Sequence, residues 1–224
     1  MKETIIQASR DVNADIILVL VVGVCGIRIF GGAMTWFSIA GLILSLVVSI
    51  VLYGRIINRA RGMSIRPSAT LINENWLNYF IVLIVLAVPV LLFGQVVKLL
   101  TLTPTAAVLT KEGIDTLVRI VAIYVLPIVF LKKENLIAIV TGIIFLFKSL
   151  RVSLPIIGIV IVMGLVHATV LLRAIEIFPS EDGLLTYVPQ MMIVNTFLTY
   201  LAFLVSAAAS RVLTEQVRYS ANEA

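Results

Sequence analysis

The chain has 224 residues, of which 61% are hydrophobic and 13% are charged. Soluble domains are about half apolar and about a quarter charged, so this composition excludes an ordinary soluble fold. The net charge of +5 does not indicate nucleic-acid binding. The basic residues stand at the ends of apolar runs, where membrane topology and anionic lipid head groups account for them.

The apolar residues fall into runs long enough to cross a bilayer, which takes about 20 residues per helix. We therefore predict a single all-α integral membrane domain over 1–224, a polytopic transmembrane helical bundle. Its six spans are expected at about 14–30, 34–54, 80–100, 114–131, 155–172 and 189–210. A shorter apolar segment at about 135–149 has basic residues on both sides. Its length predicts an interfacial or re-entrant helix rather than a span.

An arginine cluster fixes the predicted orientation. Four arginines follow the second span within one short segment: Arg55, Arg59, Arg61 and Arg66. Such a cluster resists transfer across the bilayer and stays in the cytoplasm. With six spans and both termini cytoplasmic, twelve of the 17 Lys and Arg residues lie inside and five lie at the outer side. This asymmetry supports the orientation. We expect a multi-pass protein of a bacterial cytoplasmic (inner) membrane.

Polar residues precede three of the spans, at 9–13, 73–76 and 148–151. Any span that starts in the cytoplasm needs a polar entry, and a threefold internal repeat is the alternative. Together with Tyr124-Val-Leu-Pro-Ile-Val-Phe130 and the short segment after it, these entries resemble the membrane domains attached to some glycerophosphodiester phosphodiesterases, and related six-helix bacterial families. The resemblance covers most of the chain and implies a six-helix membrane bundle. It carries over no catalytic residue, because the phosphodiesterase chemistry of those proteins lies in a separate soluble domain.

Several kinds of chemistry are missing from the sequence. One histidine and one cysteine are too few for a typical zinc site, and no phosphate-binding glycine loop is present. We expect all Asp and Glu residues in loops or at span ends, and residues 101–113 in a loop. This argues against an intramembrane aspartyl protease and a proton-coupled transporter. A serine nucleophile would have only His167 as its base. We therefore expect no catalytic, metal or cofactor site and no enzyme activity.

Four polar residues within the predicted spans form the candidate site: Arg28, Arg119, His167 and Asn195. Counting about 1.5 Å per residue from each span's midpoint places all four in the outer half of the bilayer. Their common depth suggests an outward-facing, weakly cationic pocket. In the alternative interpretation the arginines reach the outer head groups, Arg119 forms an ordinary helix-surface pair with Asp115, and His167 is a satisfied packing residue.

Small residues form two stripes at helical spacing, one in the second span and one in the sixth: Gly41, Ser45 and Ser49, and Ala202, Ser206 and Ser210. Such stripes let helices approach closely in lipid. Packing within the chain and contact with another subunit are both open. Pro89 and Pro127, inside spans, are either tolerated or cause kinks.

These observations favour a non-enzymatic accessory, scaffold or assembly subunit of a membrane complex, with membrane lipids and other membrane subunits as partners. The alternative is a transporter or channel for a small anionic solute or lipid that uses the outer pocket. An intramembrane enzyme is a third hypothesis, and it requires a serine or threonine beside His167.

Overall fold

The computed structural model describes residues 1–25, 35–100, 102–177 and 181–222, and the regular elements in these ranges are all helices. Five stretches are long and apolar enough to cross a membrane: Ile39–Ala60, Ser68–Val97, Pro104–Lys132, Leu150–Arg173 and Gln190–Gln216. Two shorter apolar helices accompany them, α2 (Ile16–Cys25) and α7 (Leu136–Lys148). For the described residues, the prediction of an all-helical fold of membrane type is confirmed.

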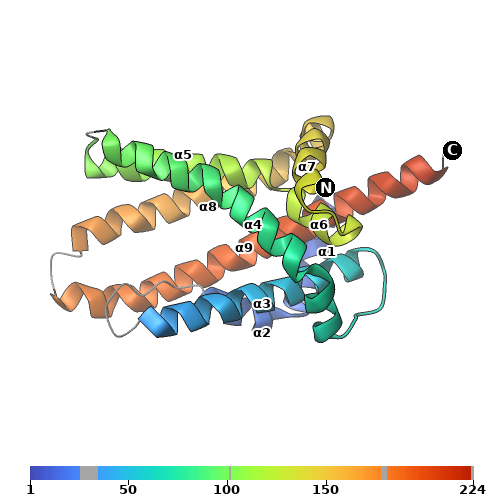
Figure 1. Cartoon of the computed structure of the whole chain (residues 1–224), viewed down its shortest axis with the longest axis horizontal. Helices are drawn as coiled ribbons and strands as arrows, with labels where there is room; N and C mark the ends of the chain where they lie inside the picture. The colour runs from blue at the N-terminus through green and yellow to red at the C-terminus, as the bar shows by residue number, and fades with distance from the viewer. Residues whose placement is uncertain (26–34, 101, 178–180, 223–224) are drawn as a thin grey trace.

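The long helices run along the longest axis of the molecule (Figure 1). They are α3 (Thr35–Ala60), α4 (Ser68–Leu99), α5 (Pro104–Val121), α8 (Leu150–Ile177) and α9 (Glu181–Asn222). Their contacts form a ring, because α3 packs on α4, α4 on α5, α5 on α8, α8 on α9 and α9 on α3. The short helices α1 (Lys2–Asn13), α6 (Val125–Lys132) and α7 gather at one end, where α7 runs across the direction of the long helices (Figure 1).

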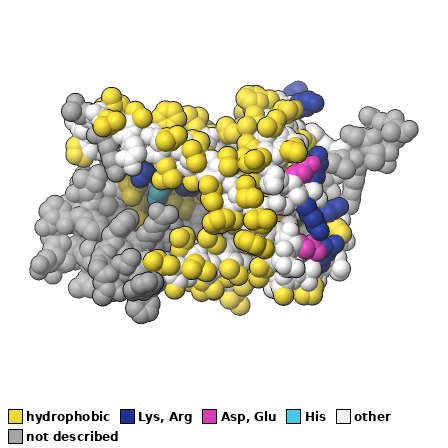
Figure 2. Space-filling model, in the orientation of Figure 1, with side chains coloured by type: hydrophobic (Ala, Val, Ile, Leu, Met, Phe, Trp, Pro, Cys, Tyr) yellow, Lys and Arg dark blue, Asp and Glu magenta, His cyan; other side chains and the backbone are white. Residues whose placement is uncertain are grey.

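Charged side chains are concentrated at that end of the molecule. Figure 2 shows a broad band of hydrophobic side chains, with most of the visible Lys, Arg, Asp and Glu side chains at the end where α1 and α6 lie. A hydrocarbon solvent favours an apolar band, while head groups and water favour the charges beyond it.

Two aspartates bind the arginines at the charged end. Asp15 lies between α1 and α2 and accepts from Arg55 at 2.8 Å and from Arg59 at 2.6 Å. Asp11 on α1 accepts from Arg211 on α9 at 2.6 Å, and its backbone carbonyl accepts from Arg59 at 2.8 Å. Both aspartates are buried. Two arginines of α3 therefore hold the N-terminal segment.

A glycine follows the end of α3, two residues after Ala60. Gly62 has φ of +70°, a left-handed conformation that glycine adopts without steric cost. The amide of Met63 then donates to the carbonyl of Asn58 at 2.8 Å, which is the hydrogen bond of a Schellman motif. The chain turns at Gly62, which lies between Arg61 and Arg66, and continues to the start of α4.

The predicted loop 101–113 is wrong, because α5 already begins at Pro104. Thr103 caps this helix by accepting from the amide of Ala106 at 3.3 Å, and proline at the first helical position loses no hydrogen bond. The predicted span 114–131 consists of two helices separated at residues 122–124. The ring of Pro127 is incompatible with a helical carbonyl four residues earlier, which accounts for this break.

Other helices extend beyond their predicted spans. Residues 68–79, which precede the span predicted at 80–100, belong to α4, and this helix passes through Pro89 without interruption. The short helix expected at 135–149 matches α7 in its bounds, and its interfacial or re-entrant position stays a prediction. The end of the predicted first span, at 26–30, lies outside the described residues.

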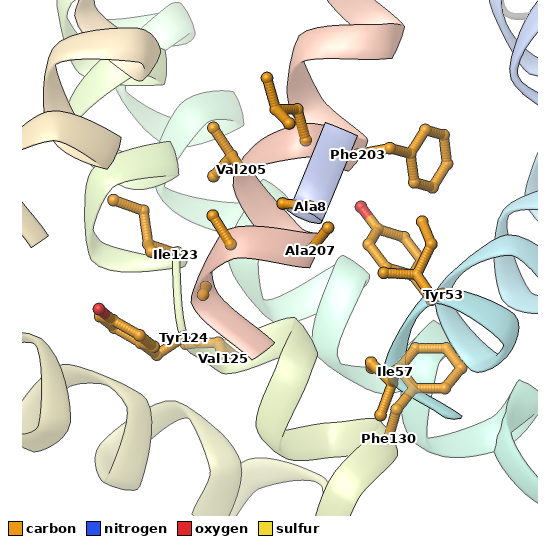
Figure 3. Packing of buried hydrophobic residues seen from close by; sticks show 14 of the residues in the cluster. Ala8, Tyr53, Ile57, Ile123, Tyr124, Val125, Phe130, Phe203, Val205 and Ala207 are labelled. Atoms are coloured by element: carbon orange, nitrogen blue, oxygen red, sulfur yellow. The ribbon is translucent and has the colours of Figure 1, made fainter. Parts of the chain in front are cut away.

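Four aromatic rings from four helices form the centre of the core near the charged end. Tyr53 lies 4.9 Å from Phe203, 5.5 Å from Phe130 and 5.8 Å from Tyr79, measured between ring centroids. Figure 3 shows Phe203, Tyr53 and Phe130 one above another. Such tilted and edge-on pairs are worth about 0.5–1.5 kcal/mol each beyond the area they bury. This cluster joins α3, α4, α6 and α9.

The segment from Tyr124 to Phe130 contributes mainly packing. Tyr124 is fully buried, and its hydroxyl lies 2.7 Å from that of Ser153 on α8. Its ring contacts Phe145 of α7 at 4.6 Å between centroids. A Cβ on Gly142 would lie 2.9 Å from the backbone nitrogen of Val125, so α7 approaches α6 closely because this residue is glycine. These contacts position α7 across the end of the bundle.

Candidate functional site

Helix α5 presents two polar rows to different neighbours. Lys111, Asp115 and Arg119 line an open groove between α4 and α5. Glu112 and Thr116, one turn apart, face α8, where they meet His167 and Gly164 respectively. Both rows exist because the helix starts at Pro104, early enough to include all of these residues.

The row that faces α8 contains a carboxylate–imidazole pair. Nδ1 of His167 lies 2.7 Å from Oε2 of Glu112. The Glu112 side chain is 7% exposed and that of His167 is 31% exposed. Gly164 admits Thr116, since a Cβ there would clash with the threonine hydroxyl. The expectation that carboxylates occur only in loops and at span ends is therefore wrong for Glu112, which lies inside a helix long enough to span a membrane.

The row that faces α4 lines the open groove between α4 and α5. Arg119 pairs with Asp115 at 2.6 Å, as the i,i+4 spacing of the two residues predicted. The groove has a volume of about 680 Å³, and its α4 wall is apolar except for Gln95. This size lies within the range of about 300–1,000 Å³ typical of ligand sites. Two cations and one carboxylate give the groove a net positive charge.

Arg119 also lines a second, inner cavity of about 200 Å³. This cavity lies between α3, α5, α6, α8 and α9, and its polar lining residues besides Arg119 are Tyr53 and Ser206. Ala122 and Leu126 line both cavities as well. Arg119, Ala122 and Leu126 thus border both the groove and the second cavity.

The four residues of the predicted pocket have different partners. His167 binds Glu112 on α5, while Arg119 binds Asp115 within α5. The Asn195 amide donates to the carbonyl of Gly23 on α2 at 2.5 Å, in a tight contact between α2 and α9. Arg28 lies outside the described residues. His167 and Arg119 thus each contact a carboxylate of α5. Asn195 instead forms a hydrogen bond that joins α9 to α2.

Sequence reasoning missed Glu112 because it began the span too late. The dipeptide Thr103-Pro104 is a strong helix-start signal, with a capping hydroxyl followed by proline at the first helical position. It would have placed Glu112 two turns inside the helix. The partner His167 is 55 residues away, and no local pattern predicts that contact.

No family model, curated protein or solved structure matches the chain. Within the described ranges, no group of three or more His, Cys, Asp or Glu side chains could hold a metal ion. What the site offers chemically is therefore the arginine–aspartate pair, the lysine and the carboxylate–imidazole pair. These groups can bind an anion and exchange a proton.

Proposed function

We propose that the chain is a non-enzymatic integral membrane protein that transports an anionic lipid, with the α4–α5 groove as its binding site. One observation carries this proposal: Arg119 lines both the open groove and the inner cavity. An arginine at the boundary of two cavities can hold a lipid phosphate with two parallel hydrogen bonds. A phosphate bound there lies at the entrance to the bundle interior.

The groove suits an amphiphile better than a small ion. Its α4 wall is formed by side chains such as Leu83, Leu86 and Val90, which suit an acyl chain. Lys111 and Arg119 on the opposite wall suit the phosphate. A small anion would contact Lys111 and Arg119 and leave the apolar part of the groove to lipid tails.

The Glu112–His167 pair, with a buried carboxylate and a partly exposed imidazole, gives the proposed transporter a group that exchanges protons. Intramembrane carboxylates and histidines commonly serve as proton relays. Glu112 lies on the same helix as Arg119, two turns earlier, and this position connects proton binding to the site. We therefore include proton coupling in the proposal, which the sequence alone argued against.

We propose six membrane crossings with both termini in the cytoplasm of a bacterial cell. The five long apolar stretches supply five crossings, and the span predicted at about 14–30 supplies the first. In this arrangement α7 lies at the cytoplasmic face, because its 13 residues are too few to cross. The arginine cluster after α3 supports the orientation.

A lipid-flipping assay tests the transport proposal. The protein is reconstituted in vesicles with a trace of fluorescent phosphatidylglycerol, and a membrane-impermeant reductant bleaches the lipid that reaches the outer leaflet. We expect bleaching beyond the initial outer-leaflet share. Arg119→Ala removes a charge-assisted hydrogen bond of about 1.5–3 kcal/mol, which corresponds to at least about a tenfold slower rate.

The matched control is Arg151→Ala, which removes an exposed arginine at the start of α8 and should leave the rate unchanged. A parallel uptake measurement with methyl phosphate distinguishes a lipid from a small anion as the transported species. Equal bleaching with wild type, Arg119→Ala and protein-free vesicles would refute transport of lipid.

The accessory-subunit hypothesis stays a prediction, as do the absence of enzyme activity and the resemblance to phosphodiesterase membrane domains. The two small-residue stripes, for which contact with another subunit was left open, give that hypothesis no support. Ser49, Ser206 and Ser210 are buried within the chain, and a Cβ on Gly41 would lie 2.9 Å from the Cys25 carbonyl oxygen. Both small-residue stripes are thus used in internal packing. Copurification of a stoichiometric membrane partner in mild detergent would favour the subunit hypothesis over an independent transporter.

A further inference from the structure

A small cavity of about 60 Å³ lies at the charged end of the molecule, away from the α4–α5 groove. It is bounded by the end of α3, the start of α4 and the end of α6. The side chains that matter to the argument are Asn58, Arg61, Arg66, Glu74, Asn75 and Lys133.

Two buried amide atoms, on residues that line this cavity, have no hydrogen-bond partner. They are Nδ2 of Asn58, a donor, and Oδ1 of Asn75, an acceptor. Asn58 is 9% exposed and Asn75 is 4% exposed. The other amide atom of Asn75 donates to the carbonyl of Leu71 at 2.8 Å, which fixes the orientation of the group. Because buried polar groups are rarely left unpaired, the two amides indicate a ligand that both accepts and donates.

Three cations and one carboxylate surround the amides. Glu74 pairs with Arg66 at 3.0 Å and with Lys133 at 3.0 Å. Arg61 is exposed and also lines the cavity. The cavity therefore keeps a net positive charge, and its main preference is for an anion.

The backbone at Lys133 is strained. Among the described residues, it is the one non-glycine residue with positive φ, at 56°. Its carbonyl accepts from Nδ2 of Asn78 at 2.9 Å, which holds the conformation. Glycine is the usual residue at such a helix end. A lysine there is unfavourable for the backbone, and strain of this kind is common at ligand sites.

We propose that this cavity binds a phosphate group that also carries an O–H donor. The phosphate oxygens accept from the cations and from Asn58, and the O–H donates to Asn75. The volume is about four to six times the ~10–15 Å³ that one water needs on this measure, so it suits a tetrahedral oxyanion better than a single water. Two sources supply this chemistry: the head group of phosphatidylglycerol and free inorganic phosphate.

The thermal unfolding of the full chain in detergent tests the proposal. The ligands are phosphate against sulfate, and phosphatidylglycerol against phosphatidylcholine. Sulfate at neutral pH is an oxyanion with no O–H donor, so it is the matched negative for phosphate. Phosphatidylcholine also lacks the O–H donor and has a quaternary ammonium that cancels its phosphate charge, so it controls for binding of acyl chains. At a ligand concentration about a hundredfold above Kd, we expect the midpoint to rise by about 5–10 °C with the O–H-bearing ligand only. A shift with phosphatidylglycerol and not phosphate assigns the lipid source, and a shift with phosphate assigns the free ion.

Two variants separate binding from folding. Lys133→Gly removes a cation and relieves the backbone, so the ligand-free protein should be at least as stable while the ligand-induced shift falls by at least half. Arg61→Ala should reduce the shift similarly. Arg151→Ala removes a charge from an exposed position that does not line the cavity, and should keep the full shift. Equal shifts with the matched ligands, no shift at all, or the same loss in Arg151→Ala would overturn the proposal.

Discussion

Asp15 shows how much one residue can determine in this molecule. Its two carboxylate oxygens bind Arg55 and Arg59 separately, and its side chain is 6% exposed. An exposed ion pair contributes about 0–1 kcal/mol. A buried one costs about 3–5 kcal/mol when a single partner is removed, because the remaining charge is left without compensation.

Replacing Asp15 by alanine should therefore lower the free energy of unfolding. The arginines keep 18–28% of their side-chain surface exposed, so we expect a loss of about 1–3 kcal/mol, between the exposed and buried limits. The measurement is thermal unfolding in detergent. Glu3→Gln changes an exposed carboxylate in the first turn of α1 and should alter stability by less than about 0.5 kcal/mol. Equal effects of the two substitutions would contradict a specific role for Asp15.

At the scale of the helices, close backbone approach decides where α7 lies. Gly142 meets the backbone of Val125, whereas a Cβ on Gly158 of α8 has no neighbour within 4 Å. The same substitution should therefore act with opposite sign at these two positions.

Gly142→Ala places a methyl group 2.9 Å from the Val125 nitrogen and should destabilise the protein by about 1–3 kcal/mol, as overpacking does. Gly158→Ala should be neutral or stabilising by up to about 1 kcal/mol, because alanine is the better helix former. Thermal unfolding of the two variants side by side gives the comparison. A stabilised Gly142→Ala protein would show that α7 is not packed against α6.

Sequence patterns predicted the helices better than their partners. Runs of apolar residues located the long helices and α7, because crossing or covering a bilayer imposes length and hydrophobicity on each segment separately. The start of α5 was not predicted, although Thr103-Pro104 is a helix-start signal. The contact of Asp11 with Arg211 joins residues 200 positions apart, and the Arg119 position between two cavities depends on five helices. Such features depend on tertiary packing, which local periodicity does not contain.

For the whole molecule, the proposed six crossings place the ends of α7 on one side of the membrane. Cysteines at Lys132 and Arg151, both exposed, test this in a Cys25→Ala background, which removes the single native cysteine. We expect an impermeant maleimide to label both only after the inner membrane is permeabilised. Thr105→Cys, at the start of α5, lies on the outer side in this arrangement and should label in intact spheroplasts. Labelling of the first two positions from opposite sides would mean that α7 crosses.

The contact between Asp11 and Arg211 also has a consequence for biosynthesis. Ribosomes add about 5–20 residues per second, so Asp11 is made about 10–40 s before the arginine that binds its carboxylate. Asp15 waits a much shorter time, because Arg55 and Arg59 follow it by 40 and 44 residues. The N-terminal segment can therefore dock on α3 early in synthesis. The Asp11 carboxylate gains the Arg211 side chain only once α9 has been translated. A chain that stalls within α8 therefore lacks both the cation that binds Asp11 and the helix on which α1 mainly packs.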